Sequence, residues 1–139
     1  MVQNSDGLAL TNQVYSVPST SGFSYKLKAI LVPDCGYSTT AWTATTTSTN
    51  NPASTSNYDN INAAGLFSAG PFSDSTTAGT YYITISSITL NVFGVDTVIN
   101  SIATTPSNSF ALFVSDGCAD AVITATAQSG IFSTVYTLG

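Results

Sequence analysis

The chain has very little charge, and this shortage excludes most kinds of chemistry. Only 6% of its 139 residues are charged, against roughly 25% in an ordinary soluble domain. Arg, Glu and His are absent, which leaves two Lys and seven Asp as the charged side chains. Hydroxyl groups supply most of the polar surface, because the chain has 20 Ser and 22 Thr. Such a surface is typical of an extracellular or assembled β-protein.

The lack of basic residues also limits the partners. The net charge is −5 and Lys26 and Lys28 are the only bases, whereas binding to nucleic acid needs clustered Lys or Arg. Anionic membrane surfaces are disfavoured for the same reason. No apolar run approaches the roughly 20 residues of a membrane span, so the sequence predicts no nucleic acid partner and no membrane insertion.

Catalytic groups are scarce as well. Nucleophilic hydrolysis normally needs a base such as His beside the nucleophile, and this chain has no His. A pair of carboxylates for glycoside cleavage would have to be two Asp. Asp116 and Asp120 are the closest pair, and they are more simply explained as surface turn residues. We therefore expect that the protein is not an enzyme and has no catalytic residues.

Cysteine is present only as Cys35 and Cys118. An even count in an acidic, hydroxyl-rich chain suggests one disulfide formed in an oxidising compartment. The alternative is a pair of buried thiols. A zinc site is disfavoured, because two Cys without His leave the ligand set incomplete.

Strand signals, by contrast, run almost from end to end. Residues 23–29 alternate apolar and polar with a period of two, which predicts a strand with Phe23, Tyr25, Leu27 and Ala29 inward and both Lys outward. Residues 80–85 and 88–92 predict two strands or one long bent strand. Further strands are predicted at residues 37–49, 95–103, 109–114, 121–127 and 131–138, with turns at 116–117 and 129–130.

Residues 50–75 form the least strand-like region, and Asn50-Asn51-Pro52 and Gly70-Pro71 are loop signals within it. One helical turn is expected over residues 61–67. The apolar content is 43%, enough for a real core, and helix-forming residues are scarce. The sequence therefore predicts one all-β domain over residues 1–139. We expect an antiparallel β-sandwich, Ig-like or jelly-roll-like, with about eight strands and a long central loop excursion.

Two short stretches resemble a known class of module. The stretch Ala78-Gly79-Thr80-Tyr81-Tyr82-Ile83-Thr84-Ile85 resembles a late strand of immunoglobulin-like modules of extracellular adhesin and filament proteins. Residues 113–118 are similar to strand ends in bacterial surface repeats. The resemblance covers about 20 residues of the chain, and the chain departs from the pattern by continuing with more strands after Ile85. The resemblance implies a cell-surface sandwich module without a catalytic role.

Calcium is the one cofactor that the available ligands would suit, because Asp carboxylates, Asn amides and loop carbonyls bind it. Asp34, Asp116 and Asp120 would converge if Cys35 and Cys118 were bonded. Asp59 with Asn57 and Asn60 is a second candidate. Neither set has the spacing of a calcium loop, so no metal is the main expectation.

A binding face for surface glycans is a further hypothesis. Exposed aromatic rings can stack on the apolar face of a sugar, and five residues are candidates for such a face: Tyr37, Trp42, Tyr58, Tyr81 and Tyr82. The competing interpretation is that a lone Trp in a sandwich belongs to the core.

The strand edges lead to the main functional hypothesis. Soluble β-proteins protect their edges with Lys, Pro and inward charges, which this chain hardly has. Either the edges are closed or pairing with other chains is their purpose. A terminal strand donated to a neighbouring subunit would complete its sheet. The N-terminal candidates are Leu8, Leu10 and Val14, slightly favoured over the C-terminal candidates, which are Phe132, Tyr136 and Leu138.

The sequence therefore predicts an extracellular structural subunit. Copies of the chain would polymerise, with each terminal strand donated to its neighbour, into a pilus-like or fibrous filament at the cell surface with an adhesive or protective role. The first alternative is a carbohydrate-binding, lectin-like module. The second is a viral coat or decoration protein, which would explain why residues 1–6 lack the pattern of a signal peptide.

Overall fold

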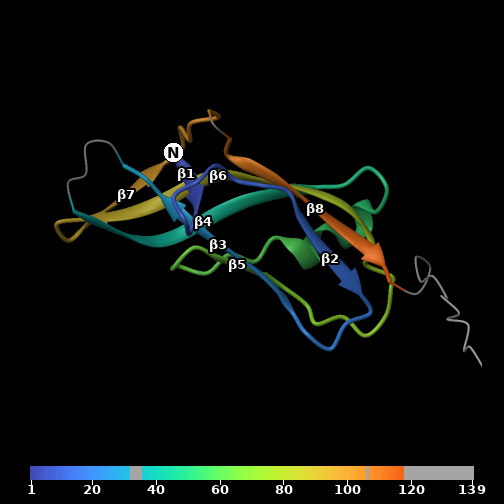
Figure 1. Ribbon diagram of the computed structural model, residues 1–139. Coiled ribbons are helices and arrows are strands. Elements are labelled where there is room, and N and C mark those ends of the chain that lie inside the picture. Colours follow the sequence, from blue (N-terminus) through green and yellow to red (C-terminus); the bar gives the residue numbers. More distant parts are fainter. Residues whose placement is uncertain (32–35, 106, 118–139) are drawn as a thin grey trace, which may run out of the picture.

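The computed structural model describes residues 1–31, 36–105 and 107–117. Within these ranges the chain is all-β, with one short helix between strands (Figure 1). The elements in chain order are β1 (Val2–Asn4), β2 (Gln13–Val17), β3 (Phe23–Ala29), β4 (Tyr37–Thr47), the 3-10 helix η1 (Pro52–Tyr58), β5 (Leu66–Ala69), β6 (Gly79–Val92), β7 (Val95–Ile99) and β8 (Ser109–Asp116). The predicted all-β class is confirmed.

The described strands form two sheets in a sandwich-like arrangement. One sheet has the order β1-β3-β5, and the other has the order β2-β8-β6-β4 with β7 also paired to β6. Five of the six pairings are antiparallel, and β2 runs parallel to β8. The larger sheet is therefore mixed, in contrast to the fully antiparallel sandwich expected from the sequence.

The alternation predicted for β3 is present in full. Leu27 and Ala29 are buried, Phe23 and Tyr25 are half-buried, and Lys26 and Lys28 are exposed. Register with β5 pairs Tyr25 with Phe67, and register with β1 pairs Lys28 with Gln3. Period-two patterning fixes which face of a strand is buried, and here it does so for every residue of β3.

The long strand β6 organises the larger sheet. It is one continuous strand of 14 residues, the second of the two arrangements that its sequence allowed. β4 pairs with residues 82–92 along one edge. On the other edge, β8 pairs with residues 79–84 and β7 with residues 88–92. β7 and β8 thus follow one another along the same edge, and the β7 end of the sheet extends away from β2.

The helical turn predicted for residues 61–67 is wrong. Ile61 forms an isolated antiparallel bridge with Phe67, and β5 begins at Leu66. Between them, the backbone NH of Gly65 donates to the Asn62 carbonyl, and Gly65 has a φ of +82°. A left-handed glycine in this position closes a turn and interrupts a helix. The helical turn of this region lies earlier, at Pro52–Tyr58, with Pro in its first turn.

Aromatic side chains fill the space between the sheets. Phe110 of β8 packs edge-on against Tyr25 of β3, with ring centroids 5.0 Å apart, and against Phe67 of β5, at 5.4 Å. Tyr58 follows in the same core, with its ring centroid 4.2 Å from that of Tyr81. These contacts hold the three-stranded sheet against β8 and β6.

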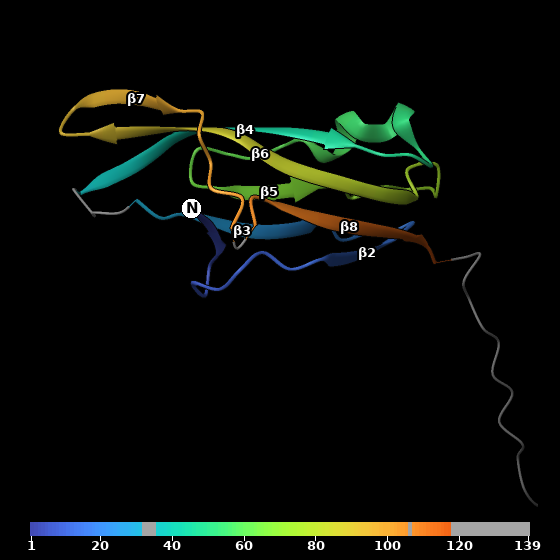
Figure 2. The same cartoon turned by 90° about the horizontal axis from the view of Figure 1, so that it is seen from above.

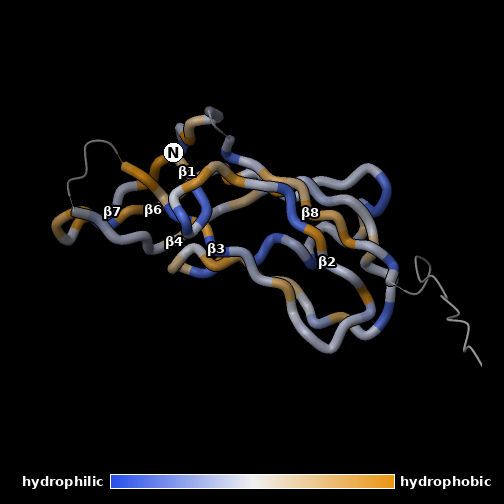
Figure 3. Tube along the Cα trace, in the orientation of Figure 1, coloured by the Kyte–Doolittle hydropathy of each residue, from blue (hydrophilic) through white to orange (hydrophobic). Residues whose placement is uncertain are grey.

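The elements are spread along one long axis. The β6–β7 hairpin lies at one end, and the last residues of β2 and β8 lie at the other (Figures 1 and 2). Apolar residues follow the interior strands, and the tip of the β6–β7 hairpin is also apolar (Figure 3). The two ends of the molecule therefore differ in structure.

Candidate functional site

The predicted metal ligands are only partly within the described structure. Asp116 is the last residue of β8, whereas Asp34 and Asp120 lie outside the described residues. In the second candidate set, the Asn60 side-chain amide donates to the Ser68 hydroxyl at 3.1 Å. Among the residues that the structure describes, no group of three Asp, Glu, His or Cys side chains could hold a metal ion. A calcium site stays a prediction.

The two cysteines of the predicted disulfide, Cys35 and Cys118, lie outside the described residues. The bond therefore stays a prediction. Gly117, the last described residue before Cys118, donates its backbone NH to the carbonyl of Val17 at 2.8 Å. This bond places the end of β8 beside the end of β2.

The five aromatic residues proposed for glycan stacking do not form one exposed face. Tyr58 and Tyr81 are fully buried, Trp42 is buried and Tyr37 is half-buried, so that only Tyr82 is exposed. Trp42 packs near Gly65, and its buried indole NH has no hydrogen-bond partner within the described structure. The structure agrees with the competing interpretation, in which the lone Trp belongs to the core.

Tyr58 and Tyr81 share one hydrogen-bond acceptor. Both hydroxyls donate to the carbonyl oxygen of Thr77, at 3.3 Å and 2.6 Å. Burial raises the pKa of Tyr58 to about 12, and it also raises the pKa of Tyr81. Neutral phenols in such a pair stabilise the fold.

The N-terminal candidates for a donated strand lie within the subunit's own fold. β2 pairs with β8 over residues 112–116 of the same chain, and Leu10 is buried in the core. Leu8 and Val14 are exposed. The C-terminal candidates, Phe132, Tyr136 and Leu138, lie outside the described residues. Residues 118–139 nevertheless supply 22 residues of chain beyond β8, which would span about 70 Å if extended.

The edges of β4 and β7 are two of the strand edges that are open in the described part of the chain. β4 pairs only with β6 there, and two register shifts interrupt that pairing, between Thr39 and Ala41 and between Thr43 and Ala44. Such bulges twist an edge away from further pairing. β7 likewise pairs only with β6, over five consecutive residues without a register shift. β7 is the more regular of the two open edges.

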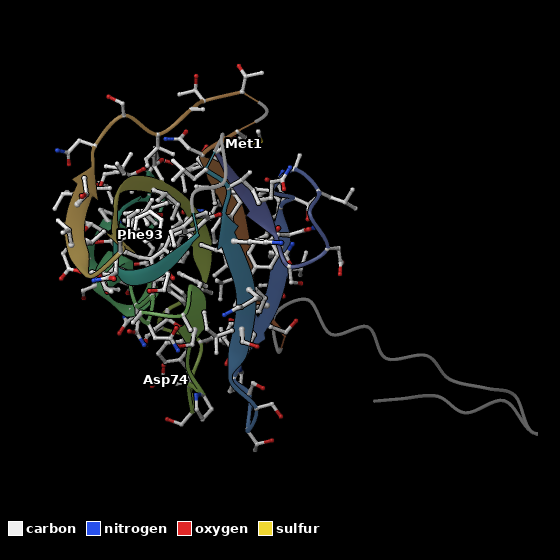
Figure 4. The ribbon with its side chains drawn as sticks, turned by 90° about the vertical axis from the view of Figure 1, so that its left-hand side faces the viewer. Met1, Asp74 and Phe93 are labelled. Carbon is white, nitrogen blue, oxygen red and sulfur yellow. The ribbon has the colours of Figure 1, made fainter. Side chains whose placement is uncertain are left out.

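The β6–β7 hairpin is unusually exposed for an apolar segment. The exposed fractions of the Phe93, Val95 and Val98 side chains are 86%, 64% and 56%, and four of the five residues of β7 are exposed. Figure 4 looks at this end of the molecule and labels Phe93. Sequence reasoning found the strand but missed this surface. A Phe-Gly pair in a position where Asn-Gly is the usual choice was the available signal.

The tip of this hairpin is held in a fixed conformation. Phe93 and Gly94 have φ values of +50° and +83°, the signs required by a type I′ turn. The Asn91 side chain accepts from the Gly94 NH at 3.2 Å and donates to the Asp96 carboxylate at 2.7 Å. A left-handed φ costs a residue such as Phe roughly 1–2 kcal/mol. The strained backbone and the exposed aromatic ring of Phe93 make the hairpin tip the candidate functional site.

No family model matches this chain, and neither a curated protein nor a solved structure gives a significant match. The described residues include no helix long and apolar enough to cross a membrane.

Proposed function

We propose that this chain is a structural subunit that polymerises head to tail into a filament at the cell surface. The observation that carries the proposal is the β6–β7 hairpin. It presents an open strand edge and an apolar tip at one end of the molecule. Exposed, regular edges invite pairing with another chain, and exposed apolar patches mark interaction sites.

The difference between the two ends of the molecule supports assembly into an open polymer. A contact between two different surfaces of identical subunits repeats without closing and generates a helical filament. The chain leaves β8 at Gly117, beside Val17, at the end far from the hairpin. A neighbour that docks there presents its β7 edge to the 22 residues that follow. Strand addition by this segment, which contains Phe132, Tyr136 and Leu138, is β-augmentation.

The composition supports a location outside the cell. A surface rich in Ser and Thr with only two Lys offers few sites to trypsin-like proteases, which suits a durable extracellular fibre. An adhesive or protective role follows from such a location. The same contact would also build a viral coat, where closed particles would replace open fibres.

Sedimentation velocity of the purified full chain over a hundredfold range of concentration tests the proposal. We expect the mean sedimentation coefficient to rise continuously with concentration, because an open polymer has no preferred final size. A single monomeric species at every concentration would contradict it. A single closed oligomer would favour a coat or decoration protein instead.

A further inference from the structure

Phe93 has an environment that the subunit alone does not explain. Its ring is 86% exposed and its φ is +50°, so the residue is strained and gains little burial in return. Aromatic side chains are the commonest anchors of protein interfaces, where they fill pockets on the partner. Strained positions tend to mark functional sites. The hairpin tip therefore has the features of one half of a contact.

A cleft at the opposite end of the molecule has the features of a surface that could receive the hairpin tip. It has a volume of about 820 Å³ and is lined by Pro18, Ser19, Thr20, Pro71 and Ser73. The backbone NH of Ser19 donates to the Phe72 carbonyl at 2.8 Å and joins the two loops. No lining residue is charged, and the size lies within the range of pockets that bind small ligands. It is large enough for an aromatic ring together with its turn.

The two loops rest on a small aromatic cluster. The ring centroid of Tyr15 lies 6.3 Å from that of Phe72 and 5.8 Å from that of Phe23. The Tyr15 hydroxyl donates to the Ser21 carbonyl at 2.9 Å, which anchors the loop that contains Pro18. Packed aromatic side chains therefore hold the two loops in place in the free subunit, which lowers the entropic cost of binding.

We infer that the Phe93–Gly94 tip of one copy inserts between the Pro18 and Pro71 loops of the next copy. This inference rests on the proposed function and names the contact that would join its subunits. The β6–β7 hairpin and the end of β2, which leads into the cleft residue Pro18, lie at opposite ends of one molecule (Figures 1 and 2). The tip therefore cannot fill the cleft within a subunit. The pairing of two different surfaces is the heterologous contact that an open filament requires.

The occupant is a hairpin of a second copy and not the chain's own following segment. Gly117, the last described residue, also lies near the cleft, since its NH bonds to the Val17 carbonyl next to Pro18. The following segment, residues 118–139, would account for the cleft but would leave the strain and exposure of Phe93 unexplained. The hairpin accounts for both surfaces at once. Occupation by residues 118–139 of the same subunit is one outcome of the test.

Two variants each remove one surface. Phe93→Asn removes the ring and creates an Asn-Gly pair, the preferred sequence of a type I′ turn, so its melting temperature should equal or exceed that of the parent chain. Ser73→Trp fills the cleft from an exposed position on its rim. Tyr82→Thr is the matched control, because Tyr82 is an exposed aromatic residue on a strand away from both surfaces. Phe93→Tyr keeps the ring.

The expected result is a pattern across the full-length variants and their mixtures. In sedimentation velocity the parent chain, Tyr82→Thr and Phe93→Tyr polymerise, and Phe93→Asn and Ser73→Trp each stay monomeric. An equimolar mixture of Phe93→Asn and Ser73→Trp forms a pair and nothing larger. The pair forms because one intact cleft and one intact tip remain between the two variants.

Each of the following results would contradict either the proposed function or the contact between tip and cleft. A parent chain that never assembles refutes the proposed function. If the parent assembles and Phe93→Asn does too, the filament stands and the tip-in-cleft contact is refuted. The contact is also refuted if Ser73→Trp assembles normally, as expected where residues 118–139 of the same subunit occupy the cleft. A mixture that gives no pair shows that the two surfaces do not bind each other.

Salt offers an independent readout of the same contact. Asp96 follows the tip and Asp74 follows the cleft residue Ser73, so both surfaces carry negative charge at their margins. Screening of like charges strengthens an apolar contact. The concentration at which half of the parent chain is assembled should therefore fall at least twofold between 0.05 M and 0.5 M NaCl. A rise over this range would overturn the contact.

Discussion

Phe110 joins the two sheets more directly than any other single side chain described above. It lies on β8 and packs on Tyr25 of β3 and Phe67 of β5. We expect Phe110→Ala to lower the free energy of unfolding by about 3–5 kcal/mol, as large core truncations do. Phe113→Ala is the control, because Phe113 is on the same strand and is 41% exposed. Its cost should be about 1 kcal/mol. Urea unfolding would measure both, and equal effects would contradict this view of the core.

Tyr58 makes the fold less stable at high pH. Burial raises its pKa to about 12 in the folded chain, whereas the unfolded chain ionises near pH 10. The unfolded state therefore loses its proton first, and stability falls as pH rises from about 10 towards 12. Below pH 10 this group contributes no pH dependence.

Urea midpoints measured between pH 9 and pH 12 test this expectation. Tyr58→Phe should reduce the fall without removing it, because burial raises the pKa of Tyr81 as well. A midpoint that stays constant to pH 12, or a fall that Tyr58→Phe leaves unchanged, would show that the phenol is not protected from ionisation.

Among the elements, period-two patterning was a reliable guide and local turn chemistry was not. It predicted β3 to the residue, because one face of that strand packs on the core and the other faces solvent. The helical turn predicted for residues 61–67 was wrong, because Gly65 closes a turn there and Phe67 is buried against the opposite sheet. Short β1 was also missed, because three residues cannot establish a period. The parallel pairing of β2 with β8 has no local sequence signal at all.

The hairpin site was harder to predict than the strands that form it. The sequence places a strand before Gly94 and another after it. It does not show that β7 extends beyond the three-stranded sheet, because that depends on the length of β6 and on β8 taking the same edge. Exposure of Phe93 follows from this arrangement of distant segments, and a single sequence does not reveal it.

Strand β3 also predicts how the native chain responds to trypsin. The only cleavage sites follow Lys26 and Lys28, and both lie within a strand that pairs with β5 and β1. The Lys26 side chain also donates to the Ala64 carbonyl. Because a paired strand cannot enter a protease, the native chain should stay intact under conditions that cleave the urea-unfolded chain within minutes. Equally rapid cleavage of the native chain would show that residues 23–29 open readily.

At the scale of the whole molecule, the two termini have different expected roles. Residues 1–17 supply β1 and β2, and Val2, Tyr15 and Val17 are buried in the core. Their deletion should unfold the chain. Deletion of residues 130–139 should leave circular dichroism and melting temperature nearly unchanged while shortening or abolishing polymers, if that segment adds a strand to the neighbour. A folded chain after the first deletion, or unaffected polymers after the second, would contradict these roles.

The composition has one consequence for the assembled state. With nine charged side chains, a subunit has little electrostatic means of keeping other copies away from its open edges. The paired bulges of β4 are a local protection, and β7 has no comparable device. The regular edge of β7 is therefore left open at one end of the molecule.

Negative-stain electron microscopy of the purified full chain would show the assembly itself. We expect unbranched filaments about one subunit wide, formed by the parent chain and lost in Phe93→Asn. Filament formation is expected because a tip at one end and a cleft at the other let each copy bind two neighbours. A field of discrete particles of uniform size at high concentration, without filaments, would contradict it.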